Sequence, residues 1–376
     1  MRFADIPGHE EVKKALVTMA DTGRVAHAML LYENEGCGAL SLSLAYLQYL
    51  NCSNRHGGDS CGECPSCRKI SKLIHPDVHF VYPVNSGSKV SASKKPVSET
   101  YLEYWRELVL KNPYFLENEM YDAFGMEGKS GVIAVAEAKS ILEKLSLSSV
   151  EDGYKAVVIW LPEKMNAETA NRLLKVIEEP PLQTIFLLIT HNQDKVLQTI
   201  FSRCQCLRIA PWTKEEVAKE LITRFGIDAD MAHEQASLSG GSPGRALYAL
   251  GESQEHVRYM EIFSGLMNAT LNRDLAAAIE TADEMSSLES KEKQKAFCIF
   301  AAECVRKIFL FQQGMENIAA VSAQDAPFYC SISPKCSKSF CAKVIPHIDR
   351  SVMLLERNVN AKIVFCDLVD QIFLSF

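Results

Sequence analysis

Several features that are missing from this 376-residue chain exclude whole classes of protein. No apolar run reaches the roughly 18 residues that a helix needs to cross a bilayer, so we expect no membrane span. Lys and Arg number 40 against 47 Asp and Glu, and the net charge of −7 argues against salt-driven binding to a DNA backbone as the main activity. The first residues, Met1–His9, contain no apolar core of a signal peptide. We therefore expect a cytoplasmic protein.

A phosphate-binding loop is expected between the first predicted strand and the helix after it, but its motif is incomplete in this chain. The apolar run Ala28–Tyr32 predicts a strand and Leu40–Leu50 predicts a helix, which is the opening order of a P-loop domain. A functional loop between them reads G-x-x-x-x-G-K-[ST], in which the lysine binds phosphate and the hydroxyl binds magnesium.

This chain departs from that loop at each of its charged or metal-binding positions. Glu33 stands in place of the first glycine, Ala39 in place of the lysine and Leu40 in place of the hydroxyl residue, while Gly36 and Gly38 remain. A carboxylate would then face the phosphate oxygens with no cation to offset it. We therefore expect no ATP to bind to this chain.

A second part of a nucleotide site is missing at the end of the strand Lys155–Trp160. In a P-loop ATPase this strand ends in acidic residues that hold magnesium and orient the attacking water. Trp160 and Leu161 occupy those positions, and Glu163 lies beyond the strand end, after Pro162. The two losses together predict a site that does not hydrolyse ATP.

Strands alternate with helices as far as residue 210, which predicts a parallel sheet with helices on both faces. Apolar patterning gives further strands at His75–Val81 and Thr184–Thr190, and Asn166 is suited to cap a helix that ends near Glu179. After Pro211 the pattern is helical. We therefore predict a P-loop α/β domain over 1–210, a small helical lid over 211–255 and a helical domain over 256–376, broken near Val321–Pro334.

Residues from about 84 to 130 read as an insertion into the α/β domain. Asn85–Ser98 is rich in Ser, Lys and Gly and predicts a loop, Tyr101–Leu110 predicts a helix, and Asn112–Lys129 is irregular and aromatic. The sequence assigns no function to this insertion.

Thirteen cysteines are present, and four of them cluster. Cys52, Cys61, Cys64 and Cys67 have the spacing C-x8-C-x2-C-x2-C. Four thiolates complete a tetrahedral zinc site and leave no position for a water, so we predict a structural zinc module over 51–78. An iron–sulfur cluster and four free thiols are the alternatives. The scattered cysteines read mostly as small buried hydrophobic residues.

Two arginines follow turn or loop signals. Arg203, in Ser202-Arg203-Cys204, follows a short helix near Val196–Phe201. Taken alone, it reads equally well as an ordinary surface arginine. Arg245 follows the Gly-Ser-Pro-Gly turn that ends at Gly244, and without a phosphate loop we expect it to pack the lid onto the core.

Together these motifs resemble the clamp-loader branch of the AAA+ ATPases. The resemblance is carried by the helix and its exit from Asn166 to Pro181, by Ser202-Arg203-Cys204, and by the four-cysteine insertion directly after the P-loop helix. The order of elements agrees from Pro7 to about Leu250. The helical tail fits less specifically, although Glu356–Lys362 is similar to the last helix of bacterial loader subunits. The insertion is longer than the family pattern predicts.

The resemblance implies a part of the bacterial DNA polymerase III holoenzyme that does not hydrolyse ATP itself. In this family, five subunits form a ring through their C-terminal helical domains and place a sliding clamp on primed DNA. Arg203 would act in trans on the ATP of a neighbouring motor subunit, a contribution that is worth roughly a thousandfold or more in related systems. The implied partners are the gamma/tau motor subunits, the delta subunit, the sliding clamp and primer–template DNA.

Two other functions remain open at this point. An active loader ATPase of the gamma/tau type would need the lysine that Ala39 replaces. A zinc-dependent nucleic-acid-binding module would use the cysteine cluster, but the acidic net charge and a closed four-thiolate site count against it.

Overall fold

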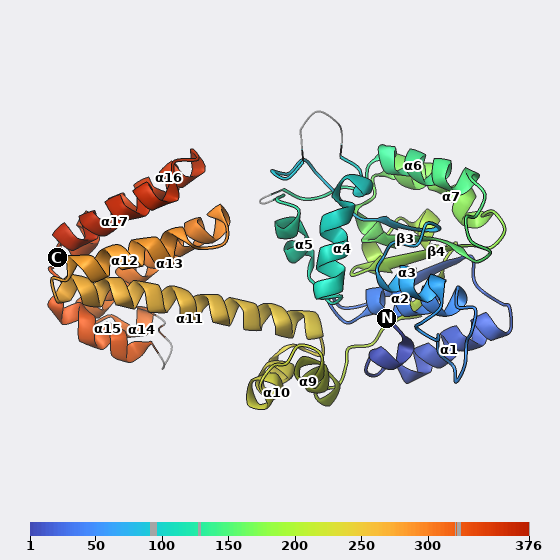
Figure 1. The fold of residues 1–376 in the computed structure, drawn as a ribbon, viewed down its shortest axis with the longest axis horizontal. Helices are drawn as coiled ribbons and strands as arrows, with labels where there is room; N and C mark the ends of the chain where they lie inside the picture. The colour runs from blue at the N-terminus through green and yellow to red at the C-terminus, as the bar shows by residue number, and fades with distance from the viewer. Residues whose placement is uncertain (91–95, 127–128, 320, 322–324, 376) are drawn as a thin grey trace. The chain divides into compact units, whose positions relative to one another are not determined.

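Five strands pair in parallel to form the sheet at the centre of the N-terminal part of the chain (Figure 1). They are β1 (Ala28–Tyr32), β2 (Val78–Val81), β3 (Lys155–Trp160), β4 (Thr184–Thr190) and β5 (Gln205–Arg208), in the spatial order β2-β3-β4-β1-β5. Strand β1 lies inside the sheet, with Leu30 opposite Leu188 of β4 and Cys206 of β5. The predicted parallel sheet is confirmed.

The computed structural model describes residues 1–90, 96–126, 129–319, 321 and 325–375. These fall into two units, Met1–Leu250 and Gly251–Phe376. The predicted division at 210 and 255 stays a prediction. Parts of the predicted insertion (91–95 and 127–128) and of the predicted break in the tail (322–324) lie outside the described residues.

Ten helices of the described residues lie wholly within the first unit. They are α1 (Glu10–Asp21), α2 (Ala39–Leu50), α3 (Pro65–Ser71), α4 (Leu102–Lys111), α5 (Glu117–Ala123), α6 (Val135–Ser146), α7 (Ala167–Glu178), α8 (Gln198–Phe201), α9 (Lys214–Thr223) and α10 (Ala229–Leu238). Helix α7 shows how the sequence sets a boundary, because the Asn166 side chain accepts a hydrogen bond of 2.8 Å from the N–H of Thr169, as its role as a cap predicts.

Helices cover both faces of the sheet. Because successive side chains of a strand point to opposite faces, one strand contributes to the core on each face. Met29 and Leu31 of β1 belong to the core that includes α2, α3 and α4. Ala28 and Leu30 belong to the core that includes α6, α7 and α8. Every residue of α2 is buried, which explains why this helix is rich in Leu and Ala.

Helix boundaries differ from the sequence prediction in three places. Helix α5 forms inside Asn112–Lys129, which we predicted to be irregular. Helix α11 (Pro243–Leu271) begins inside the predicted Gly-Ser-Pro-Gly turn, because proline is well tolerated in the first helical turn. Helix α15 (Ala326–Ile332) occupies part of the predicted break in the tail.

The second unit is helical. After the end of α11 it contains α12 (Leu275–Ser286), α13 (Lys291–Gln312), α14 (Glu316–Ala319), α15, α16 (Phe340–Glu356) and α17 (Ala361–Ser375). A core of Phe, Ile, Val, Leu and small residues joins these helices, with Phe297, Phe340 and Phe365 among the fully buried side chains. Among the described residues, no helix has the length and apolar character that a bilayer crossing requires.

Candidate functional site

The loop between β1 and α2 binds one of its own carboxylates. Glu33 is 8% exposed, and its Oε2 accepts a hydrogen bond of 2.7 Å from the N–H of Ala39, the first residue of α2. A helix N-terminus is the place where a phosphate loop binds phosphate, because unpaired N–H groups and the helix dipole both favour an anion there. The Glu33 carboxylate therefore occupies the anion position at the start of α2.

His191, directly after β4, supplies a second partner for Glu33. Its Nε2 lies 3.6 Å from Glu33 Oε1. Burial lowers the pKa of His191, but the hydrogen bond and charge of Glu33, with the charges of Glu35 and Glu163, outweigh burial and raise it. The carboxylate is thus paired with a cationic imidazole at low pH.

The rest of the loop is closed by residues from the end of the first unit. Trp212 Nε1 donates a hydrogen bond of 2.6 Å to the carbonyl of Cys37, and Ser242 Oγ donates one of 2.7 Å to the carbonyl of Glu35. The N–H of Gly244 donates to the carbonyl of Gly36 at 3.2 Å. Cys37 is fully buried, and burial raises the pKa of its thiol to about 12. The loop is therefore tied by its backbone to the 212–244 region.

The end of β3 is aromatic, where an ATPase would carry acidic residues. Trp160 is buried, and its ring contacts those of Phe115 and His191 at centroid separations of 5.1 and 5.6 Å. Leu161 is fully buried. Glu163 lies after the strand, and its carboxylate accepts hydrogen bonds from the Thr190 hydroxyl at 2.7 Å and the His191 N–H at 3.1 Å. Glu163 therefore binds the end of β4.

Arg203 lies between α8 and β5, with its side chain one third exposed. Its Nε donates a hydrogen bond of 2.8 Å to Oε2 of Glu178, at the end of α7, and its guanidinium also donates to the carbonyl of Thr199 at 2.9 Å. Glu178 is 55% exposed, so this is a surface ion pair, a kind worth about 0–1 kcal/mol. Neighbouring Cys204 is half-buried, and burial raises the pKa of its thiol to about 12.

Arg245 has a different environment from the one we expected. Its N–H binds Ser242 Oγ at 3.1 Å, but its side chain is exposed. The packing that we assigned to Arg245 is instead made by its buried neighbours Ser242 and Ala246.

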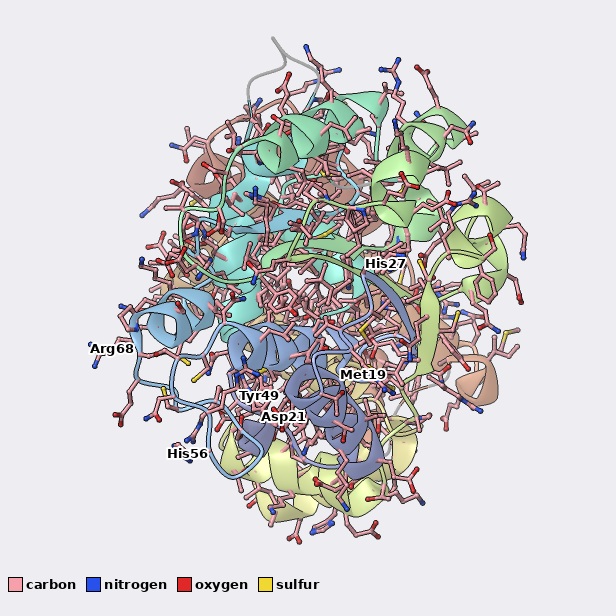
Figure 2. All side chains as sticks on the ribbon, turned by 90° about the vertical axis from the view of Figure 1, so that its right-hand side faces the viewer. Met19, Asp21, His27, Tyr49, His56 and Arg68 are labelled. Carbon is pink, nitrogen blue, oxygen red and sulfur yellow. The ribbon has the colours of Figure 1, made fainter. Side chains whose placement is uncertain are left out.

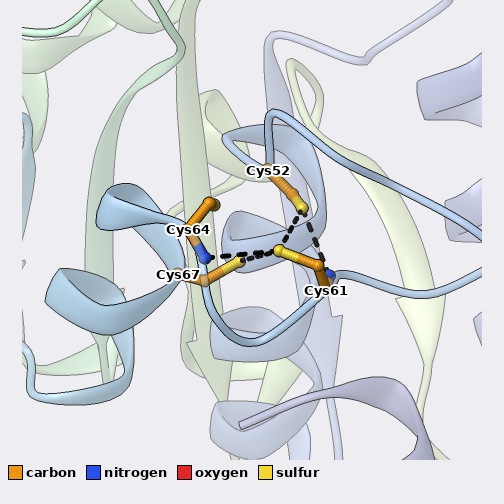
Figure 3. A group of neighbouring side chains, drawn as sticks. All are labelled: Cys52, Cys61, Cys64 and Cys67. Atoms are coloured by element: carbon orange, nitrogen blue, oxygen red, sulfur yellow. Dashed lines mark hydrogen bonds between the residues drawn. The ribbon is translucent and has the colours of Figure 1, made fainter.

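The four predicted metal ligands lie together (Figure 3). Cys52 follows α2, Cys61 lies in the loop, Cys64 immediately precedes α3 and Cys67 lies within it. Their Sγ atoms all lie within 4.8 Å of one another, with 3.5 Å between Cys52 and Cys61 and 3.9 Å between Cys61 and Cys67. A tetrahedral zinc with Zn–S bonds of about 2.3 Å needs sulfur separations of about 3.8 Å, so the cluster fits this ion.

Backbone N–H groups point at the sulfur atoms of this cluster. Cys61 Sγ accepts from the N–H groups of Glu63 at 3.5 Å and Cys64 at 3.4 Å, which lowers the pKa of the Cys61 thiol. The N–H groups of Asn54 and Cys61 donate to Cys52 Sγ. Burial, the largest influence at Cys67, raises the pKa of that thiol. A bound cation would overcome this effect, because metal binding favours the thiolate.

The cysteine module is fastened to the helices around it. Asp59 accepts hydrogen bonds from the N–H groups of Phe3 at 3.1 Å and Ala4 at 2.9 Å. Figure 2 shows Tyr49 of α2 beside Asp21 of α1, and the guanidinium of Arg55, in the module, lies 5.1 Å from the centroid of the Tyr49 ring. In the same view, His56 lies on the module's outer loop. The fold at this module therefore depends on both its sulfur cluster and its neighbours.

Sequence reasoning missed three groups at these sites. It did not anticipate that Glu33 would bind Ala39, that His191 would pair with Glu33, or that Glu178 would bind Arg203. One signal was available in the sequence: Glu33 lies a few residues before the start of a predicted helix. An acidic side chain near a helix N-terminus is favourable, because the N-terminus carries a partial positive charge.

The parallel sheet and the altered loop after β1 define a P-loop-type α/β protein whose phosphate position is taken by its own carboxylate. Comparison with known proteins names the family. Residues 8–213 match the family model described as DNA polymerase III, delta subunit, and the chain belongs to this family. This confirms the relationship inferred from the sequence, which pointed to the delta-prime subunit through the altered loop and the missing acidic residues.

Curated relatives agree with this result. The chain is 32% identical over 281 residues to DNA polymerase III subunit delta′ of Yersinia pestis, covering 71% of this chain and 67% of the relative. It is 27% identical over 232 residues to the subunit of the same name from Escherichia coli strain K12, covering 62% and 57%. The chain thus spans between about half and two thirds of the relatives it matches.

A solved structure of a DNA polymerase III gamma subunit-related protein from Thermotoga maritima matches at a TM-score of 0.34 and 16% identity, covering 96% of this chain and 99% of that one.

Proposed function

We propose that this chain is a clamp-loader subunit that binds no ATP and supplies Arg203 to the ATP site of a neighbouring motor subunit. The partners would be the gamma/tau motor subunits, the delta subunit, the sliding clamp and primer–template DNA, the last two through the assembled complex. The second unit would provide the contacts between subunits. Exposed apolar side chains there support this role, among them Ile299 and Ile363, each 65% exposed.

The observation that carries the proposal is the hydrogen bond between Glu33 and Ala39. A phosphate at the start of α2 would have to displace a carboxylate from the same N–H group, and residue 39 offers no ammonium group to bind it. Trp160 and Leu161 likewise offer no side-chain oxygen for magnesium at the end of β3. The loop and the strand end thus argue independently against hydrolysis by this chain.

Arg203 has the properties that a contribution in trans requires. Its guanidinium is partly exposed, and a planar fork of N–H donors can bind two phosphate oxygens at once. Leaving Glu178 for a phosphate costs little, because an exposed ion pair contributes about 0–1 kcal/mol. A guanidinium placed beside the transferred phosphoryl group neutralises the charge that develops in the transition state.

We also propose that Cys52, Cys61, Cys64 and Cys67 bind a structural Zn²⁺. Four sulfur ligands leave no position for a water or a substrate, so the ion would hold the module together and take no part in catalysis.

ATP hydrolysis by the reconstituted loader, with clamp and primed DNA, tests the role of Arg203. With Arg203→Ala we expect the rate to fall roughly a thousandfold while assembly and the stability of the isolated chain are retained. Arg172→Ala is the matched control, because Arg172 is also exposed and paired with a glutamate, Glu168. An unchanged rate would reduce Arg203 to ordinary surface, and a stability loss of several kcal/mol would mark it as structural.

Nucleotide binding by the isolated chain tests the other half of the proposal. The alternative, an active ATPase of the gamma/tau type, requires Mg-ATP to bind to this chain at micromolar to millimolar concentration. We expect no binding by equilibrium dialysis, with a gamma/tau subunit as the positive control. The other alternative, a zinc-dependent nucleic-acid-binding module, requires tight, salt-sensitive binding of DNA by the isolated chain.

A further inference from the structure

The middle of the insertion, residues 112–117, lies against the loop that would otherwise bind phosphate. We propose that this segment, here called the plug, is an intramolecular ligand that fills the place beside the altered loop and fastens α9 to the sheet, as a bound nucleotide would. The proposal rests on the proposed absence of nucleotide from this chain.

The backbone of the plug contacts the glycines around the loop. A Cβ atom built on Gly36 would lie 3.0 Å from the carbonyl oxygen of Tyr114, and one built on Gly244 would overlap that same oxygen. Gly36 also has a φ of +77°, which disfavours any other residue. Glycine at these two positions therefore makes room for the plug.

One end of the plug is bound by the loop itself. Glu35 Oε1 accepts a hydrogen bond of 2.6 Å from the N–H of Glu117, the first residue of α5. The Glu117 carboxylate in turn pairs with Lys164, just after β3, at 2.8 Å. The loop after β1 and the segment after β3 are thus joined through the plug.

Tyr114 connects the plug to α9. Its ring is 1% exposed and meets Trp212 edge-on at a centroid separation of 5.5 Å. Its hydroxyl donates a hydrogen bond of 2.8 Å to Oε1 of Glu220, a buried residue of α9. The guanidinium of Arg224, the residue directly after α9, lies 5.8 Å from the ring centroid. Tyr114 is therefore bonded to the helix that follows residue 211.

Phe115 connects the plug to the end of β3. Its ring lies 5.1 Å from that of Trp160 and 5.4 Å from that of Trp105 in α4, measured between centroids. The plug therefore touches the loop after β1, the end of β3 and α9. These are the elements that a nucleotide joins in a P-loop domain with a helical lid, which is the reason to regard the plug as a ligand.

Hydrogen exchange on the full-length chain, followed by mass spectrometry, tests the plug. With Tyr114→Ala we expect the amides of α9 and of residues 33–38 to exchange roughly tenfold faster or more. Local opening of these segments then costs less free energy, because the contacts of Tyr114 no longer have to be broken. Exchange in α6 and α7 should not change. Tyr104→Ala is the matched control, since Tyr104 belongs to the same insertion but lies under Lys89, with 4.9 Å between Nζ and the ring centroid. Unchanged exchange in α9 of Tyr114→Ala would overturn the proposal.

Tyr114→Phe keeps the test decisive if the alanine variant does not fold. It retains the ring and removes only the hydrogen bond to Glu220, so we expect α9 to exchange roughly threefold faster. No change in α9 with this folded variant would also contradict the plug.

A separate arm distinguishes this proposal from the proposed function. Mg-ATP added to the wild-type chain should not slow exchange in α9. Protection of α9 by Mg-ATP would disprove the absence of nucleotide. Wild-type exchange rates in α9 of Tyr114→Ala, measured without nucleotide, would disprove the plug alone.

Discussion

Two regions at opposite edges of one sheet differ in how they treat charge. The loop after β1 lies at the edge where the parallel strands end, and its carboxylate, Glu33, is buried and satisfied within the chain. Arg203 precedes β5, at the edge where the strands begin, and it is partly exposed and paired with the exposed carboxylate of Glu178. A site that would receive a nucleotide is closed, while the group that would serve another subunit's nucleotide stays accessible.

The difference has a physical basis. A buried carboxylate is costly unless it is hydrogen-bonded, so Glu33 makes the closed edge dependent on particular partners. A surface ion pair contributes little, so Arg203 can leave Glu178 at small cost. The closed edge should therefore be sensitive to single substitutions, and the open edge tolerant of them.

Removing metal from the cysteine module is expected to have the largest effect. Apparent binding free energies of about 10–16 kcal/mol in small zinc peptides would make the proposed zinc ion a main source of local stability. Chelation should unfold residues 52–67 locally and leave the second unit folded, as followed by hydrogen exchange, with one zinc released per chain. The loop after β1 should stay protected if its closure depends on its own contacts. Release of the chain from its partners without local unfolding would contradict a structural role.

Replacing Glu33 tests the closed edge directly. Glu33→Ala leaves the buried N–H of Ala39 unpaired, which should lower the free energy of unfolding by about 1–3 kcal/mol. Glu33→Gln should lose less, because its amide oxygen still accepts. All three tryptophans, Trp105, Trp160 and Trp212, lie in the first unit, so urea unfolding followed by their fluorescence reports on that unit. Asn34→Ala, at the exposed neighbouring position, is the control; an equal loss there would contradict the special role of Glu33.

The pH dependence of the stability that His191 contributes should be a smaller effect. The raised pKa means that the folded chain holds the proton more tightly than the unfolded chain. The contribution of His191 is therefore complete below its usual pKa of 6.5 and is lost as pH rises through the raised value. The stability difference between wild type and His191→Gln should accordingly shrink with rising pH, and this pH dependence should be weaker in a Glu33→Gln background, where only the charges of Glu35 and Glu163 still raise the pKa of His191. If the stability difference between wild type and His191→Gln instead grew with pH, the pKa of His191 would be lowered in the folded chain, and this prediction would be wrong.

Glu178→Gln should have the smallest effect, on the open edge. It removes the ion pair of Arg203, so we expect a stability change below about 1 kcal/mol and loader ATP hydrolysis within about twofold of wild type. If Glu178→Gln lost hydrolysis as completely as Arg203→Ala, Glu178 would be needed to position the arginine. The contrast between the closed edge and the open edge would then be wrong.

Elements were predictable from sequence where local patterns decide them. The strand bounds of β1, β3 and β4 follow from apolar runs, and α7 begins where Asn166 caps it. The cysteine cluster followed from spacing, because the ligands are close in sequence. The plug could not be predicted from the sequence. Its irregular, aromatic residues are explained by contacts of Tyr114 with Trp212 and Glu220, which lie about a hundred residues away in the chain. Such contacts depend on the assembled fold and leave no periodic signal.

The covalent attachment of the plug has a consequence for how the subunit responds to the cell. A free nucleotide occupies a site in proportion to its concentration, whereas a tethered segment has a fixed effective concentration set by the chain itself. Because Tyr114 belongs to the same polypeptide as Glu220, their association would not vary with the ratio of ATP to ADP. If the proposed motor subunits change shape at each ATP turnover, the first unit of this chain would keep one arrangement of α9 and the sheet throughout.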